Sequence, residues 1–300
     1  MSSADTDPST ASSLINLALF VWGAVIWWRF QFASSTAEYR RCRLPATHIS
    51  LSEFVFKVIV LLVGAFVGAA IGSWFAGRVP GGLKADPAHV TFIAGIGFDL
   101  GGLIALLIFR RTPAWVLPSN RSLPLEYLTT NAGMAPPPTP DTAPRIAKKD
   151  VFKAGLYTYL AATMAVVVVQ QIWFFVLDKL HVEAPRQPVI DLLKGTHTTA
   201  ILVMAGLLAV VVAPILEELV FRAGIFRFGK QVLPRWAAFM LSAVTFGLAH
   251  ASVSACVPLV VFAYILALSY ERTGRIEVTM IAHALFNLTS LVLLVAGLDS

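Results

Sequence analysis

Apolar runs of about 20 residues recur along this 300-residue chain and leave few alternatives to a bundle of membrane-spanning helices. A spanning segment must satisfy its own backbone polar groups, which favours helices in a bilayer. Charged residues make up 13% of the chain, against about 25% in soluble domains. We therefore predict an all-α, polytopic transmembrane bundle. Its roughly eight predicted spans are Leu14–Trp28, Phe54–Ala76, Val90–Phe109, Ala154–Leu177, Thr198–Leu216, Trp236–Ala249, Ser254–Tyr270 and Val278–Leu298.

A proline-rich stretch divides these spans into two groups. Residues 133–145 contain too many prolines for a helix or a central strand. The predicted organisation is thus an N-terminal three-helix membrane segment at 1–111, a cytoplasmic Pro-rich loop at 112–153, and a membrane core at 154–300.

The net charge of +6 has a better explanation than nucleic-acid binding. Lys and Arg gather in the loops on one side of the predicted spans, as expected for cytoplasmic loops. This distribution predicts an integral protein of the cell (inner) membrane with both termini on the non-cytoplasmic side. Membrane lipid is its expected surroundings, and no nucleic-acid partner is predicted.

Two adjacent carboxylates follow the fifth predicted span. Ionisable groups at membrane depth are costly and are usually functional. On a helix, Glu218 and Arg222 share a face, whereas Glu217 points elsewhere. We expect Glu218 and Arg222 to pair, leaving Glu217 able to act as a general base. The alternative is that both acids only cap the cytoplasmic end of a helix.

Two further polar clusters lie in apolar sequence. Phe246 precedes His250 by one helical turn and can brace its ring. His283 and Asn287 also share a helix face, and both can donate hydrogen bonds to a developing oxyanion. His250 could instead be a structural histidine at a helix end, and His283 and Asn287 could form a polar seam between helices. If the sixth segment crosses the bilayer completely, His250 lies far from Glu217, so we expect the fifth helix to continue beyond Arg222.

The order of these clusters resembles that of the CPBP intramembrane proteases, which include type II CAAX prenyl endopeptidases and bacteriocin-processing, Abi-like proteins. The resemblance covers about residues 198–298. It is carried by the motifs Glu217-Glu-x-x-x-Arg222, Phe246-x-x-x-His250, Tyr270-Glu-Arg-Thr-Gly274 and His283-x-x-x-Asn287.

This resemblance implies a glutamic-type intramembrane endopeptidase that needs no metal or other cofactor. Glu217 and His250 would together deprotonate a water molecule, and His283 and Asn287 would stabilise the oxyanion. The implied substrate is a short peptide or a lipid-anchored protein, such as a CAAX-like tail.

The resemblance also implies supporting roles for Glu218, Arg222 and Phe246. Outside the motifs, Asp99 interrupts the third predicted span and could pair with Lys57 on the second.

Two other functions fit the same residues. Glu217, His250 and His283 could bind zinc in a membrane metallopeptidase, with Glu218 as the base. Asn287 has no role in that scheme, and the chain has no His-Glu-x-x-His motif. The cluster could also serve a non-enzymatic scaffold, immunity protein or transporter, although transporters usually contain internal repeats and none is visible here.

Overall fold

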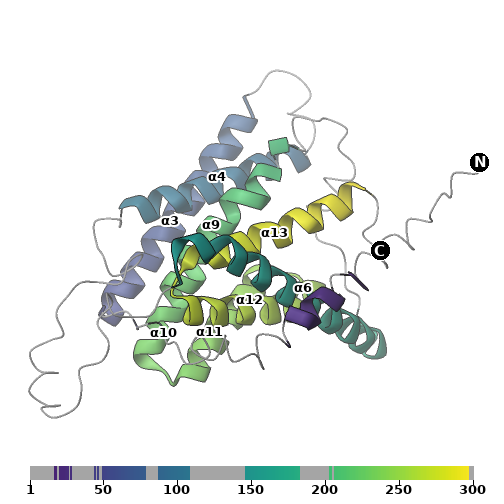
Figure 1. Cartoon of the computed structure of the whole chain (residues 1–300). Coiled ribbons are helices and arrows are strands. Elements are labelled where there is room, and N and C mark those ends of the chain that lie inside the picture. Colours follow the sequence, from purple (N-terminus) through teal and green to yellow (C-terminus); the bar gives the residue numbers. More distant parts are fainter. Residues whose placement is uncertain are drawn as a thin grey trace, which may run out of the picture.

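The computed structural model describes residues 51–78, 87–108, 146–182 and 208–296, and parts of 17–28, 44–50 and 203–207. All regular structure in these residues is helical, which confirms the predicted all-α bundle (Figure 1). The Pro-rich stretch 133–145 lies outside the described residues, as do residues 14–16, 19 and 27 of the first predicted span.

Five of the described helices are long and apolar enough to cross a membrane. They correspond to the second, third, fourth, seventh and eighth predicted spans. The sixth predicted span is the shorter helix α11 (Arg235–Ala249). The five long helices are α3 (Leu51–Ala76), α4 (Pro87–Ile108), α6 (Val151–Lys179) with the short η4 (Lys148–Asp150) before it, α12 (Val253–Thr273) and α13 (Ile276–Val295).

Helices α3 and α4 lie antiparallel and in close contact. A Cβ atom added at Gly68 would overlap the carbonyl oxygen of Gly97, and one at Gly101 would overlap that of Gly64. Only glycine permits the two backbones to approach this closely, as is common between membrane helices. The contact joins α3 and α4 into one tightly packed pair.

The fifth predicted span is part of a longer helix that carries the acidic pair. It runs through η5 (Leu208–Val212), α9 (Ala213–Glu217), η6 (Glu218–Phe226) and α10 (Arg227–Val232). The expectation that it continues beyond Arg222 is confirmed. Both η5 and η6 have π-helical winding. This winding is rare in proteins overall, but where it occurs it is often at a functional site.

A sharp turn then reverses the chain. Leu233 is extended, as expected for a residue before proline, and Pro234 precedes the first residue of α11. Helix α11 packs back against η6. The helical segments on the two sides of this turn, Glu217–Val232 and Arg235–His250, contain the same number of residues. Helix α11 therefore returns His250 towards the level of the acidic pair.

Hydrogen bonds between side chains join α6 to the last two helices. Thr158 lies 2.8 Å from Ser269 on α12, and Tyr159 lies 2.7 Å from Thr289 on α13, between hydroxyl oxygens. At the end of α12, Gly274 adopts a left-handed conformation (φ 64°) that allows α13 to begin two residues later. These contacts hold α12 and α13 in one bundle with α6.

An ionic cluster fastens the far end of the acid-bearing helix. Glu271 on α12 is fully buried and accepts hydrogen bonds from Lys230 (2.5 Å) and Arg235 (3.1 Å). Lys230 also donates to the carbonyl oxygen of Leu44, ahead of α3. The cluster therefore ties α10, α11 and α12 together, away from Glu217.

Candidate active site

The two adjacent carboxylates occupy different surroundings. Glu218 is fully buried, and its Oε1 atom lies 3.1 Å from an Nη atom of the equally buried Arg222. The Glu217 side chain remains 25% exposed. Its buried Oε2 atom accepts no hydrogen bond from the part of the chain that the structure describes. The predicted ion pair of Glu218 with Arg222 is thus present, and Glu217 lies outside it.

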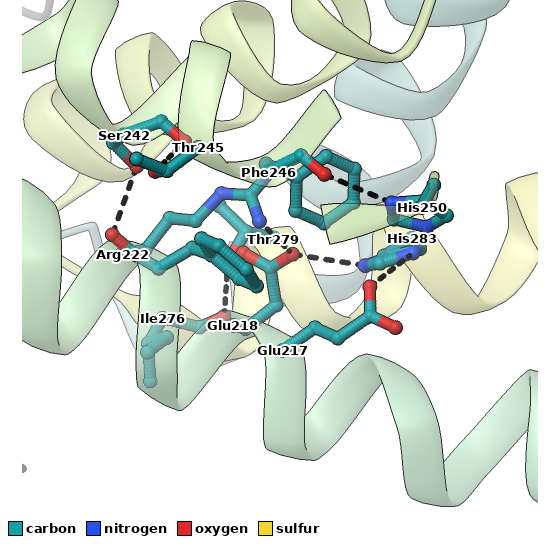
Figure 2. A network of polar contacts seen from close by, with 11 residues as sticks. Glu217, Glu218, Arg222, Ser242, Thr245, Phe246, His250, Ile276, Thr279 and His283 are labelled. Carbon is teal, nitrogen blue, oxygen red and sulfur yellow. Dashed lines mark hydrogen bonds and ion pairs between the residues drawn. The ribbon is translucent and has the colours of Figure 1, made fainter. Parts of the chain in front are cut away.

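His283 on α13 lies between the two carboxylates (Figure 2). Its Nδ1 is 2.9 Å from Glu218 Oε1, and its Nε2 is 3.7 Å from Glu217 Oε2. Because a carboxylate oxygen accepts, the short contact places a proton on Nδ1 and directs Nε2 towards Glu217. His283, which the sequence pattern places on the same helix face as Asn287, therefore also contacts both acids.

The Phe246 ring is the common surface on which the other groups meet. The Arg222 guanidinium carbon lies 4.5 Å from the ring centroid, within the range of a cation–π contact. The rings of His250 and His283 have centroids 4.8 Å and 5.8 Å from it. Phe246 is fully buried, so this arrangement fixes the spacing of the two imidazoles and the guanidinium.

His250 is half-buried at the end of α11, directly before Ala251, which has a positive φ of 47°. Its Nδ1 lies 2.9 Å from the carbonyl oxygen of Phe246. A carbonyl oxygen can only accept, so Nδ1 carries a proton and Nε2 of the neutral ring is an acceptor. This tautomer leaves Nε2 able to take a proton.

Asn287 joins α13 to the π-helical segment η5. Its Nδ2 donates to the carbonyl oxygen of Ala209 at 2.7 Å. An asparagine amide has two N–H donors, so this bond orients the group and uses one of them. The interhelical seam considered for this residue is present, and a second donor remains.

The zinc alternative needs three ligands around one point. Among the described residues, no group of three His, Cys, Asp or Glu side chains has an arrangement suited to a metal ion. His283 already has its two ring nitrogens next to Glu218 and Glu217. The described side chains therefore do not fit the zinc alternative.

Sequence reasoning did not find two features of this region. Thr279 is fully buried on α13 and interacts with the Glu218 carboxylate. Its place one helical turn before His283 was the only available signal. Asp99 interacts with Glu217, whereas the suggested partner Lys57 bonds to Glu53 at 2.7 Å.

Together these side chains offer a partly exposed carboxylate, a nearby imidazole, a buried cation and hydrogen-bond donors, all carried by apolar helices. This defines an integral membrane protein with a buried polar site of a kind suited to hydrolysis. Residues 199–289 match the family of type II CAAX prenyl endopeptidases described as Rce1-like. The match confirms the predicted family resemblance over this part of the chain and indicates a protease. No curated protein and no solved structure matches the chain.

Proposed function

We propose that this protein is an intramembrane endopeptidase of the glutamic type, in which Glu217 is the principal base. The observation that supports this most is the contrast between the two acids. Glu218 is enclosed and paired with Arg222 and His283. The Glu217 side chain is partly exposed, and its buried Oε2 atom has no hydrogen-bond partner among the described residues. Only the second environment gives water access to a carboxylate.

In the proposed reaction, a water molecule loses a proton to Glu217, assisted by Nε2 of His250. The resulting hydroxide attacks the carbonyl carbon of the peptide bond and leaves a tetrahedral oxyanion. The proton then passes to the leaving nitrogen as the carbon–nitrogen bond breaks. The products are a carboxylic acid and an amine, and the base is returned to its starting state.

The oxyanion is stabilised by the second N–H of Asn287 and by Nε2 of His283, which in this proposal carries a proton on both ring nitrogens. Glu218 holds the His283 ring through Nδ1, as a buried carboxylate orients the histidine of a serine protease. Arg222 balances the charge of Glu218. Phe246 keeps both imidazoles in place through ring contacts.

The proposed substrate is a membrane-associated peptide, such as the C-terminal tail of a prenylated protein. The family match supports a CAAX-type tail. Long apolar helices around the site favour a substrate that is already anchored in the bilayer. We further propose that the chain lies in the cell membrane with both termini outside.

The proposal is tested with the full-length protein in liposomes and a fluorogenic farnesylated CAAX peptide. Cleavage by the wild type and loss of at least about 100-fold in kcat for Glu217→Gln support it. Glu277→Gln makes the same chemical change at an exposed acid on α13 and should leave kcat unchanged. Full activity of the Glu217→Gln protein would overturn the assignment of the base and favour a non-enzymatic role.

A further inference from the structure

One face of α4 packs against the acid-bearing helix. Positions 99, 102, 103 and 106 lie on one side of a helix. Leu106 and Leu103 pack in one apolar cluster with Leu216. A Cβ atom at Gly102 would lie 3.1 Å from a Leu216 methyl carbon. Asp99 is therefore on the face of α4 that meets the residue before Glu217.

Asp99 is half-buried, and Glu217 is the charged group with which it interacts. Arg222 pairs with Glu218 and also interacts with Glu217. On its other side, Glu217 approaches Nε2 of His283 at 3.7 Å. Glu217 thus has a carboxylate on the α4 side and an imidazole on the α13 side.

These surroundings act on Glu217 in one direction. Like charges repel strongly where solvent is scarce, so Asp99 disfavours a Glu217 position close to α4. Arg222 and the doubly protonated His283 of the proposed mechanism attract the same carboxylate towards α13 and η6. The balance keeps the Oε2 atom of Glu217 next to His283, inside the cluster of side chains proposed to act on the substrate.

We propose that Asp99 is a positioning residue of the site, which directs the Glu217 carboxylate towards His283 through its negative charge. This inference rests on the proposed function. It also extends the functional unit beyond residues 199–289, because Asp99 lies on α4. The α3–α4 pair then serves the reaction as well as the stability of the bundle.

The charge of Asp99 can be removed with little change of shape. Asp99→Asn abolishes the repulsion and supplies an amide that can donate to Glu217 and draw it towards α4. We expect kcat to fall about 10- to 100-fold, since small displacements of a reacting group have effects of this size. KM should change by no more than about twofold, because Asp99 does not touch the proposed substrate.

The experiment measures kcat and KM separately with the farnesylated peptide in liposomes. Asp99→Glu restores the charge and should return kcat to within about threefold of the wild type, which a merely structural role does not require. Asp178→Asn, the same change at an exposed acid near the end of α6, is the matched control. If Asp99→Asn does not fold, Asp99→Ser gives the same test with a smaller uncharged side chain.

Wild-type kinetics for the uncharged variant overturns the inference, as does failure of Asp99→Glu to recover kcat. An increase of KM alone also overturns it, because Asp99 would then act on substrate binding. These results leave the proposed function intact if Glu217→Gln is inactive. If Glu217→Gln is fully active, the proposed function itself fails.

Discussion

His283 Nδ1 lies 2.9 Å from Glu218 Oε1, which joins α13 to η6 across 65 residues of chain. Both side chains are buried, and Glu218 also contacts Arg222 at 3.1 Å. The carboxylate thus neutralises one cation and orients one imidazole. Its loss should affect the stability of the bundle as well as the reaction.

Glu218→Gln should lower the free energy of unfolding by about 3–5 kcal/mol, because it leaves the buried Arg222 without its counter-charge. Thermal unfolding in detergent measures the change. Glu217→Gln is the control and should cost less than about 1 kcal/mol, since Glu217 makes no close ion pair with an arginine or lysine of the described residues. Equal stability of the two variants would contradict the pairing role of Glu218.

His250→Ala should lower kcat by about 10²–10⁴-fold, which is the usual contribution of a general acid or base. Its stability should change little, because the ring is half-buried and bonds only to a carbonyl oxygen within the described residues. Turnover of the farnesylated peptide is compared with the unfolding midpoint of the same preparation. Loss of activity with a matching loss of folded protein would instead indicate a structural histidine.

Asn287→Ala should lower kcat by about 10²–10³-fold, as expected for removal of one oxyanion donor. The lost bond to Ala209 should reduce the free energy of unfolding by only about 0.6 kcal/mol, the average for hydrogen bonds between membrane helices. Tyr159→Phe removes another such interhelical bond outside the site and is the control. If both variants had similarly small effects on kcat, Asn287 would only join the two helices and would not stabilise the oxyanion.

Gly68→Ala should separate α3 from α4, because its Cβ atom would overlap the Gly97 carbonyl oxygen. We expect a loss of at least about 1–3 kcal/mol in stability, typical of overpacking. Gly95→Ala on α4 is the control, since nothing lies within 4 Å of its added Cβ atom. That change should be neutral or stabilising by up to about 1 kcal/mol.

Ala251→Gly should stabilise the protein by about 1 kcal/mol. Ala251 has a φ of 47°, and the left-handed region costs a non-glycine residue about that much. The greater freedom of glycine in the unfolded chain reduces the gain. Peptide turnover should be unchanged, since His250 keeps its bond to Phe246. A lower unfolding midpoint would show that Ala251 is not strained.

Sequence patterns predicted the features that depend on neighbours within one helix. The positions of the long apolar helices follow from run length, and the pairing of Glu218 with Arg222 follows from their spacing. The continuation of the acid-bearing helix beyond Arg222 was also predicted. In each case the information lies within a few turns of the same segment.

Contacts between helices were harder to predict. The sequence placed His283 with Asn287 on one face, but not against Glu218, because the rotation of α13 depends on its packing with α6, α12 and η6. Lys57 bonds to Glu53, one helical turn away on the same helix, whereas the sequence suggested Asp99 on the next helix. The π-helical winding of η5 and η6 left no pattern in the residues.

That winding makes the acid-bearing helix sensitive to its own length. A π-helical turn holds more residues than an α-helical turn, so η6 accommodates additional chain between Glu218 and Arg227. Unless the turn returned to α-helical winding, deleting one residue there would rotate all that follows by about 100°. Lys230 would then turn away from Glu271 even with every side chain unchanged. For this stretch, a shortened chain is a more severe change than most substitutions.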